Sequence, residues 1–288
     1  MAEERFNAEA HYKGDSFEWI VLVHGFGGSA RTWKRQIDLF EKHYNLLVLE
    51  MHTRKVDECP DLDKVCKLIS NTLDHYKIEK AHFLGFSFSS LICLRFAVLY
   101  PEAVRSLIMG GGIIKFNLRT RSLLFLAITF KNMINYMLLY RFFAYIIMPK
   151  KNHQLSRTIF VNEAKKLGYD EFCKWLDLIP QTTNGLAWID ALDENIKVLY
   201  VSGNEDYLFL KDTFKYSKKI RNSRFEIIEK CGHVCSIEQY DKFNIIVLRY
   251  LNPNGCTGVC SNAHVKQGYR SCNHWEHGER REIPGIIY

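Results

Sequence analysis

The stretch HFLGFSFSSLICLRFAVLYPEAV, residues 82–104, combines two kinds of sequence pattern. A short apolar run ends at Gly85, and a strongly apolar segment begins at Ser89 and stops before Pro101. An apolar run without alternation suits a strand buried on both faces, and a proline disfavours helix at the residue before it. The stretch therefore predicts a strand, a tight turn at Ser87 and a helix.

The same alternation of strand and helix continues along most of the chain. Further apolar runs that suit buried strands lie at 19–25, 44–51, 80–86, 105–111, 196–203 and 224–233. Helical spacing of apolar residues marks 31–42, 61–76 and 89–100. This order predicts an α/β protein with a mostly parallel central sheet and helices on both faces.

Composition excludes several classes of protein. Hydrophobic residues make up 47% and charged residues 25% of 288 residues, which argues against disorder. A net charge of +7 is mild for this length, so we expect no nucleic-acid partner. The polar N-terminal stretch lacks the apolar core of a signal peptide, and the nine cysteines are scattered and odd in number. Both observations predict reduced thiols and a cytoplasmic location.

Residues 114–195 break the alternation and are helical in character. The apolar stretch 122–149 is interrupted by Lys131, Asn132, Asn135 and Arg141, so it does not predict a membrane-spanning helix. We expect a helical cap at 114–195 that lines a pocket, inserted into a core formed by 1–113 and 196–251.

The cap is basic along its first half. Between residues 115 and 157 the chain has eight Lys or Arg and no Asp or Glu. One interpretation is a set of solvated helix faces. The other is attraction to an acidic substrate or to anionic lipid, which would give peripheral membrane contact through a basic, aromatic cap.

The last segment, residues 252–288, has no sustained apolar periodicity. It contains six side chains of metal-ligand type, Cys256, Cys260, Cys272, His264, His274 and His277. Their spacing matches no zinc module, because there is no C-x-x-C pair. We expect a disordered or non-core C-terminal extension and no metal site.

A glycine-rich turn follows the first predicted strand. His24, Gly25, Phe26, Gly27 and Gly28 lie between an apolar run and a helix. Glycines at such a turn let backbone N–H groups face a ligand, as in an anion-binding nest. The spacing does not fit the dinucleotide pattern G-x-G-x-x-G, because residue 30 is alanine.

Three residues that could act together in nucleophilic catalysis each lie at or just past the end of a predicted strand. Ser87 lies in a turn of the pattern G-x-S-x-S, Asp206 follows the strand 196–203, and His233 lies at the end of the strand 224–233. Their order along the chain is nucleophile, acid, histidine. Because sites collect at the carboxyl ends of parallel strands, we expect the three side chains to meet there. Glu205, beside Asp206, is an alternative acid.

The motifs HGFGGS, GFSFSS, SGNEDYLF and CGHVCSIEQYDKF together resemble the α/β-hydrolase superfamily over about residues 17–251. The resemblance implies that His233 takes the proton of Ser87 and that Asp206 orients the imidazole. It also implies an oxyanion hole formed by the backbone N–H groups of Phe26 and Phe88.

The resemblance further implies a substrate pocket at Gly25, Gly27 and Phe86. The chain departs from the family at residue 89, where serine replaces the usual glycine, and after the strand 44–51, where the family's Asp-x-Pro-Gly-His-Gly-like loop is replaced by EMHTRKVDE.

From these residues we expect a serine hydrolase that cleaves carboxylic esters of apolar acyl groups through an acyl-enzyme intermediate. A small ester or lipid-like molecule is the expected partner, and the chemistry needs no cofactor. Alternatives with the same three residues are an acyltransferase, a thioesterase and a C–C bond hydrolase. A non-catalytic receptor or regulator of the same fold is the alternative from another class.

Overall fold

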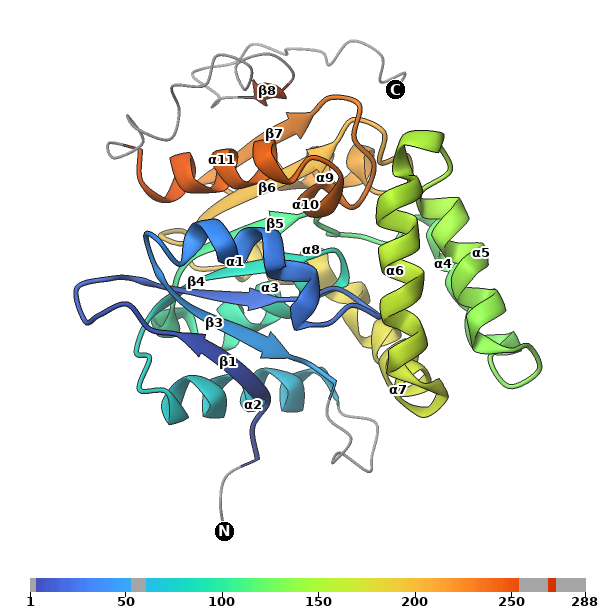
Figure 1. The fold of residues 1–288 in the computed structure, drawn as a ribbon, viewed down its shortest axis with the longest axis horizontal. Helices are drawn as coiled ribbons and strands as arrows, with labels where there is room; N and C mark the ends of the chain where they lie inside the picture. The colour runs from blue at the N-terminus through green and yellow to red at the C-terminus, as the bar shows by residue number, and fades with distance from the viewer. Residues whose placement is uncertain (1–3, 53–60, 254–268, 273–288) are drawn as a thin grey trace.

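A computed structural model describes residues 4–52, 61–253 and 269–272. Its centre is one sheet with the strand order β1-β3-β2-β4-β5-β6-β7-β8 (Figure 1). The strands are β1 (Asn7–His11), β2 (Trp19–Val23), β3 (Asn45–Glu50), β4 (Ala81–Phe86), β5 (Val104–Gly110), β6 (Lys197–Gly203), β7 (Ser223–Ile228) and β8 (Tyr269–Cys272).

Strands β2 to β7 pair in parallel, and the two edge strands pair antiparallel. The predicted mostly parallel sheet with helices on both faces is therefore confirmed. Each of its six parallel strands overlaps a predicted run, although β5 and β7 begin one residue before theirs and β7 ends at Ile228, well before residue 233. In the register of the central pair, Val23 on β2 lies opposite Gly85 on β4. The strand ends that carry the glycine-rich turn and Ser87 are therefore neighbours.

The sequence gives little sign of β1. Its residues, NAEAH, are exposed or half-buried, and the strand is held by backbone pairing with β3 and by a hydrogen bond from the Tyr76 hydroxyl to Ala8 O at 2.9 Å. A polar edge strand needs no apolar run, because most of its side chains are exposed to solvent.

Helices cover both faces of the sheet because alternate strand residues point to opposite sides. Ile20 and Leu22 enter the core beneath one face, whereas Val21 and Val23 enter the core beneath the other. The first face carries α1 (Lys34–Phe40), α10 (Cys235–Glu238) and α11 (Tyr240–Leu251), and the second carries α2 (Leu62–His75), α3 (Phe88–Leu99), α8 (Gly185–Asp190) and α9 (Leu210–Ser217).

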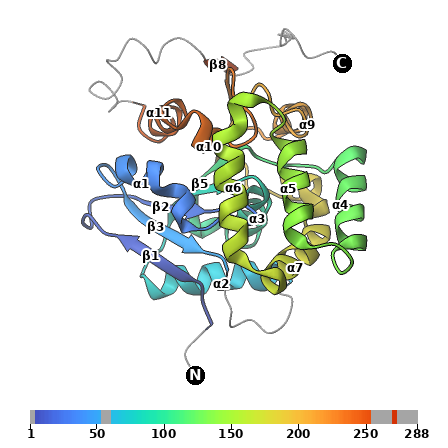
Figure 2. The ribbon, with the colours of Figure 1, turned by 45° about the vertical axis from the view of Figure 1, so that its right-hand side comes forward.

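The segment predicted as a cap lies beyond the carboxyl ends of the parallel strands (Figures 1 and 2). It contains α4 (Leu118–Phe130), α5 (Tyr136–Ile147), α6 (Gln154–Leu167) and α7 (Tyr169–Leu178) before α8. Short 3-10 helices complete the chain at η1 (Ala30–Trp33), η2 (Pro101–Ala103), η3 (Lys151–His153) and η4 (Ile179–Asn184). None of the described helices is long and apolar enough to cross a membrane.

The C-terminal segment is described only in part. Residues 269–272 pair with β7 as β8, which adds a strand at the edge of the sheet. The remainder of the predicted extension beyond residue 253, with its other metal-ligand-type side chains, lies outside the described residues. The cysteines whose side chains are described are free thiols, namely Cys66, Cys93, Cys173, Cys231 and Cys235.

Candidate active site

Ser87 lies at the turn between β4 and α3 in a strained conformation. Its φ of 54° and ψ of −120° fall where L-residues with a side chain are rare. Two backbone hydrogen bonds hold it there: its N–H donates to Gly110 O at 2.9 Å, and its carbonyl accepts from Ser90 N at 3.0 Å. The turn thus presents the hydroxyl at the carboxyl edge of the sheet.

Glycine is required two residues before Ser87 for lack of space. A Cβ on Gly85 would lie 2.8 Å from Cys93 Sγ and 2.9 Å from the backbone oxygen of Ser89. Gly25, in the neighbouring turn, is equally confined, since its Cβ would lie 2.9 Å from Phe86 O. The strand, the helix and the glycine-rich turn therefore meet backbone to backbone around Ser87.

Ser89, where the family pattern has glycine, is fully buried and hydrogen-bonded. Its Oγ accepts from Phe86 N at 2.8 Å and lies 2.6 Å from Val23 O, to which it can donate. The hydroxyl thus joins the turn to β2, and the departure from the pattern adds a polar link at the turn.

Replacing Ser89 by alanine is expected to lower the free energy of unfolding by about 1–3 kcal/mol, because buried backbone groups lose their partner. Urea denaturation of both proteins measures the difference. Ser122→Ala is the control, because that exposed hydroxyl only bonds back to Leu118 O, and its change should stay within about 0.5 kcal/mol. Equal stability of Ser89→Ala and wild type would contradict this role.

The loops after β6 and β7 bring Asp206 and His233 to Ser87. A Cβ on Gly203 would lie 2.1 Å from Cys231 O, and Glu205 N donates to the same oxygen at 2.8 Å, so the two loops pack tightly. His233 Nε2 lies 2.7 Å from Ser87 Oγ, and His233 Nδ1 lies 2.7 Å from Asp206 Oδ2. A base so placed can remove the hydroxyl proton, with the carboxylate orienting the ring.

Glu205 points away from this trio and into the cap. Its carboxylate accepts from Lys150 Nζ at 2.7 Å and from Asn152 Nδ2 and His153 Nε2 at 2.9 Å. Burial alone would raise the pKa of Glu205, but these hydrogen bonds together lower it to about 2. Glu205 therefore ties the cap to the Asp206 loop, whereas Asp206 is the carboxylate in contact with His233.

The two residues predicted to supply oxyanion-hole N–H groups, Phe26 and Phe88, lie in the segments that adjoin Ser87. Phe88 is the first residue of α3, where helical N–H groups have no partner within the helix, and Phe26 lies in the turn packed against Ser87. Tyr140 of the cap braces that turn, because its hydroxyl donates to Phe26 O at 3.1 Å. Gly27, with φ of 69°, leaves room for this hydroxyl, which a Cβ would approach to 2.1 Å.

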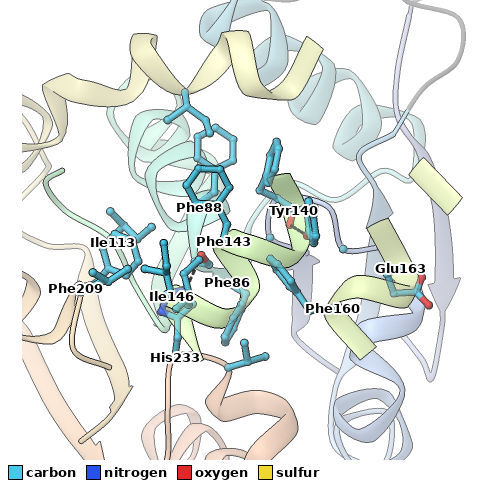
Figure 3. Close-up of a pocket in the computed structure, with 18 of the residues that line it drawn as sticks. Phe86, Phe88, Ile113, Tyr140, Phe143, Ile146, Phe160, Glu163, Phe209 and His233 are labelled. Atoms are coloured by element: carbon cyan, nitrogen blue, oxygen red, sulfur yellow. Dashed lines mark hydrogen bonds between the residues drawn. The ribbon is translucent and has the colours of Figure 1, made fainter. Parts of the chain in front are cut away.

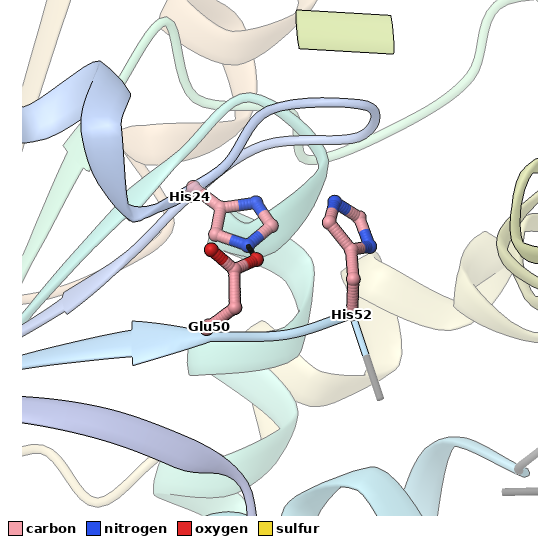
Figure 4. A group of neighbouring side chains, drawn as sticks. All are labelled: His24, Glu50 and His52. Carbon is pink, nitrogen blue, oxygen red and sulfur yellow. Dashed lines mark hydrogen bonds and ion pairs between the residues drawn. The ribbon is translucent and has the colours of Figure 1, made fainter. Parts of the chain in front are cut away.

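His24, Glu50 and His52 hold the other side of the glycine-rich turn (Figure 4). Their donor atoms lie within 4.8 Å of one another, which is a metal-ligand arrangement in outline. The ring nitrogens of His24 are already engaged, however, since Nε2 accepts from Met51 N and Nδ1 lies 3.0 Å from Gly25 O. His52 Nε2 lies 2.6 Å from Gly28 O, and Glu50 Oε2 accepts from Ala30 N. The three side chains therefore anchor the turn.

An apolar pocket opens beside Ser87 and His233 (Figure 3). The core contributes Phe86, Phe88 and Phe209, and the cap contributes a set of aliphatic and aromatic side chains that includes Leu123, Leu124, Ala127, Tyr140, Phe143, Ile146, Ile147 and Phe160. Of the residues predicted for the pocket, Gly25 and Phe86 line it. Gly27 does not, because it faces the Tyr140 hydroxyl.

Glu163 is the one acidic side chain among the described residues that line the pocket, and none of them is Lys or Arg. Its carboxylate accepts from Ser29 Oγ at 2.6 Å and also from Lys166. Burial alone would raise the pKa of Glu163, but the hydrogen bonds from Lys166 and Ser29 outweigh it and lower the pKa. The pocket lining is therefore apolar with one carboxylate, whose ion-pair partner Lys166 lies outside the lining.

Sequence reasoning missed Tyr140, His153 and Glu163. Each contacts a residue at least 52 positions away in the chain, so no local spacing could reveal the contact. Helical spacing could have shown only that Tyr140 and Glu163 lie on inward faces of cap helices.

A family model matches about half of the chain, and a curated relative matches most of it. The family model described as alpha/beta hydrolase fold matches residues 18–168. A 2-hydroxy-6-oxononadienedioate/2-hydroxy-6-oxononatrienedioate hydrolase from Klebsiella pneumoniae is 26% identical over 264 residues, covering 83% of this chain and 88% of that protein.

Solved structures share the fold at lower sequence identity. An enol-lactonase from Burkholderia xenovorans superposes with a TM-score of 0.73 at 14% identity, over 85% of this chain and 96% of that one. A hydrolase from Oleispira antarctica superposes with a TM-score of 0.75 at 16% identity, over 87% of this chain and 96% of that one.

Proposed function

Since the chain belongs to the alpha/beta hydrolase family, we propose that it is a serine hydrolase cleaving carboxylic esters of neutral, apolar acyl groups. One observation carries the proposal: His233 lies 2.7 Å from both Ser87 Oγ and Asp206 Oδ2, at the wall of an apolar pocket. A hydroxyl, a base and an orienting carboxylate in that sequence suffice for acyl transfer to serine.

In the proposed mechanism, Ser87 Oγ attacks the ester carbonyl as its proton passes to His233 Nε2. The N–H groups of Phe26 and Phe88 stabilise the negative oxygen of the tetrahedral intermediate. His233 then protonates the leaving alkoxide, and the acyl group remains on Ser87. Water, deprotonated by His233, releases the acid and restores the serine. Asp206 stabilises the imidazolium in both halves of the reaction.

The charge of the pocket supports a neutral acyl group. A carboxylate on the acyl chain would enter an apolar space that contains Glu163 and no lining cation. Transferring an ion from water into such a site without a partner of opposite charge costs several kcal/mol of free energy. An aliphatic chain instead gains from contact with the apolar side chains that line the pocket.

C–C bond hydrolysis is the second candidate, because the Klebsiella pneumoniae relative is named for it and aligns over most of both chains. The same serine, histidine and aspartate would serve either reaction. By its name, however, the substrate of that relative is a dioate, which carries two carboxylates. The lining of this pocket favours the ester.

We expect p-nitrophenyl butyrate to be hydrolysed with at least about 100-fold higher kcat/KM than the p-nitrophenyl monoester of glutaric acid, whose acyl chain ends in a carboxylate. Release of p-nitrophenolate measures both reactions. C–C cleavage is tested in parallel by incubating the protein with a 2-hydroxy-6-oxo-dienedioate and measuring the decrease of its ultraviolet absorbance. Comparable rates on the two esters, or faster turnover of the dienedioate, would contradict the proposal.

Glu163→Gln should narrow the preference for the neutral ester several-fold, because it removes the like charge from the pocket. Asp170→Asn is the matched control: it changes net charge equally, but Asp170 is exposed and does not line the pocket.

A fluorophosphonate probe distinguishes an enzyme from a non-catalytic receptor of the same fold. If the probe does not label the folded protein, the protein is a non-catalytic relative.

A further inference from the structure

Helices α4 and α5 are apolar on two opposite sides. Toward the sheet, Leu123 and Leu124 of α4 and Phe143 and Ile147 of α5 line the pocket. On the outer side of the two helices, away from the pocket, lies a second set of large apolar side chains: Leu118, Phe125 and Leu126 on α4, and Leu138, Phe142 and Tyr145 on α5. We call this second set the outer cap face. A soluble surface helix normally has polar residues there.

The outer cap face is well exposed and continuous along each helix. Phe125 is 68% exposed, and on α5 Leu138, Phe142 and Tyr145 follow the spacing i, i+4, i+7 with exposures of 58%, 55% and 61%. Both helices lie at the outer edge of the molecule, away from the sheet (Figures 1 and 2). An apolar patch of this kind marks an interaction surface.

The positive charge around the outer cap face distinguishes between the partners that could cover it. Exposed arginines flank it, with Arg119 and Arg121 on α4 and Arg141 on α5, and none of them makes an ion pair with a described residue. Acidic residues are absent from positions 115–162 of the sequence. Two copies joined through this face would bring like charges together, whereas an anionic bilayer supplies both apolar depth and opposite charge.

We propose that the outer cap face binds peripherally to anionic lipid bilayers, with α4 and α5 lying in the interfacial plane. The aromatic and aliphatic side chains enter the boundary of the acyl chains, and the arginines pair with lipid phosphates. The pocket-lining faces of the same two helices then lie directly behind the membrane surface. This surface goes beyond the proposed ester chemistry and does not depend on it.

Sedimentation with sucrose-loaded vesicles tests the proposal on the full chain. At low salt the protein should partition onto vesicles of phosphatidylcholine and phosphatidylglycerol at least about tenfold more strongly than onto phosphatidylcholine alone. Binding should fall as salt is raised, because ions screen the lipid charge within a shorter distance. Equal binding to both vesicles, or none to the anionic ones at low salt, would overturn the proposal.

Two variants separate the charge from the apolar contact. Arg119→Gln/Arg121→Gln/Arg141→Gln should weaken binding to anionic vesicles roughly 100-fold, at about fivefold for each charge. Phe125→Ser/Phe142→Ser should weaken it at least about tenfold by removing inserted side chains.

The control is a triple variant that removes the same number of positive charges from another part of the surface. Lys42→Gln/Lys67→Gln/Lys80→Gln alters three exposed lysines of the core, outside the cap, and should bind nearly as wild type does. Far-ultraviolet circular dichroism and urea denaturation show that each variant is folded. If the control loses as much binding as the arginine variant, the attraction is non-specific and the proposal fails. If light scattering finds a wild-type dimer that Phe125→Ser/Phe142→Ser dissociates, a second copy covers the face and the proposal also fails.

Discussion

Replacement of Ser87 by alanine is expected to lower kcat for p-nitrophenyl butyrate by about 10⁵–10⁶-fold. Without the hydroxyl no acyl-enzyme forms, and His233 at 2.7 Å has no proton to accept. The backbone N–H groups of Phe26 and Phe88 remain, so a slow residual hydrolysis should persist above the uncatalysed rate. Stopped-flow or steady-state release of p-nitrophenolate measures both quantities.

The intact mass after treatment with a fluorophosphonate gives an independent readout of the nucleophile. Wild type should gain one adduct, located on Ser87 by peptide mapping, and Ser87→Ala should gain none. Ser236→Ala is the matched control, because Ser236 also lines the pocket but lies outside the hydrogen-bonded trio. It should be labelled as wild type is. If Ser87→Ala is folded and retains wild-type turnover, Ser87 is not the nucleophile.

Much of this site could be expected from the sequence, because its residues follow strands of a parallel sheet. Parallel pairing places the carboxyl ends of β4, β6 and β7 at one edge, so three residues that each follow a strand converge. The convergence of Ser87, Asp206 and His233 can therefore be predicted from their order in the chain, without knowing the conformations of the loops. Apolar runs mark those strands because both faces of the sheet are covered.

The cap contacts could not be expected in the same way. Tyr140 reaches Phe26 O and His153 reaches Glu205 through pairings that depend on how α5 and η3 lie over the core. Helical spacing predicts that these segments are helices, but it does not fix their positions. Gly27 shows the consequence: the family resemblance implied a pocket residue there, whereas its space is filled by the Tyr140 hydroxyl.

Asp206→Asn is expected to lower kcat by about 10⁴-fold. An amide in place of the carboxylate can donate to His233 Nδ1, which favours the ring tautomer with its proton on Nε2. That nitrogen then cannot accept the proton of Ser87, and the positive charge that develops on the ring loses its partner at 2.7 Å. Steady-state kinetics on p-nitrophenyl butyrate measures the loss. Urea denaturation of the same preparation shows whether the fold is retained.

Glu205→Gln separates the two neighbouring carboxylates of this loop. Because Glu205 bonds to Lys150, Asn152 and His153, its neutral replacement should lower the free energy of unfolding by about 1 kcal/mol and leave kcat within about tenfold of wild type. The opposite pattern, with kcat lost in Glu205→Gln and kept in Asp206→Asn, would make Glu205 the working acid. The structure argues against that pattern, since the loop would have to turn Glu205 out of three hydrogen bonds to reach His233.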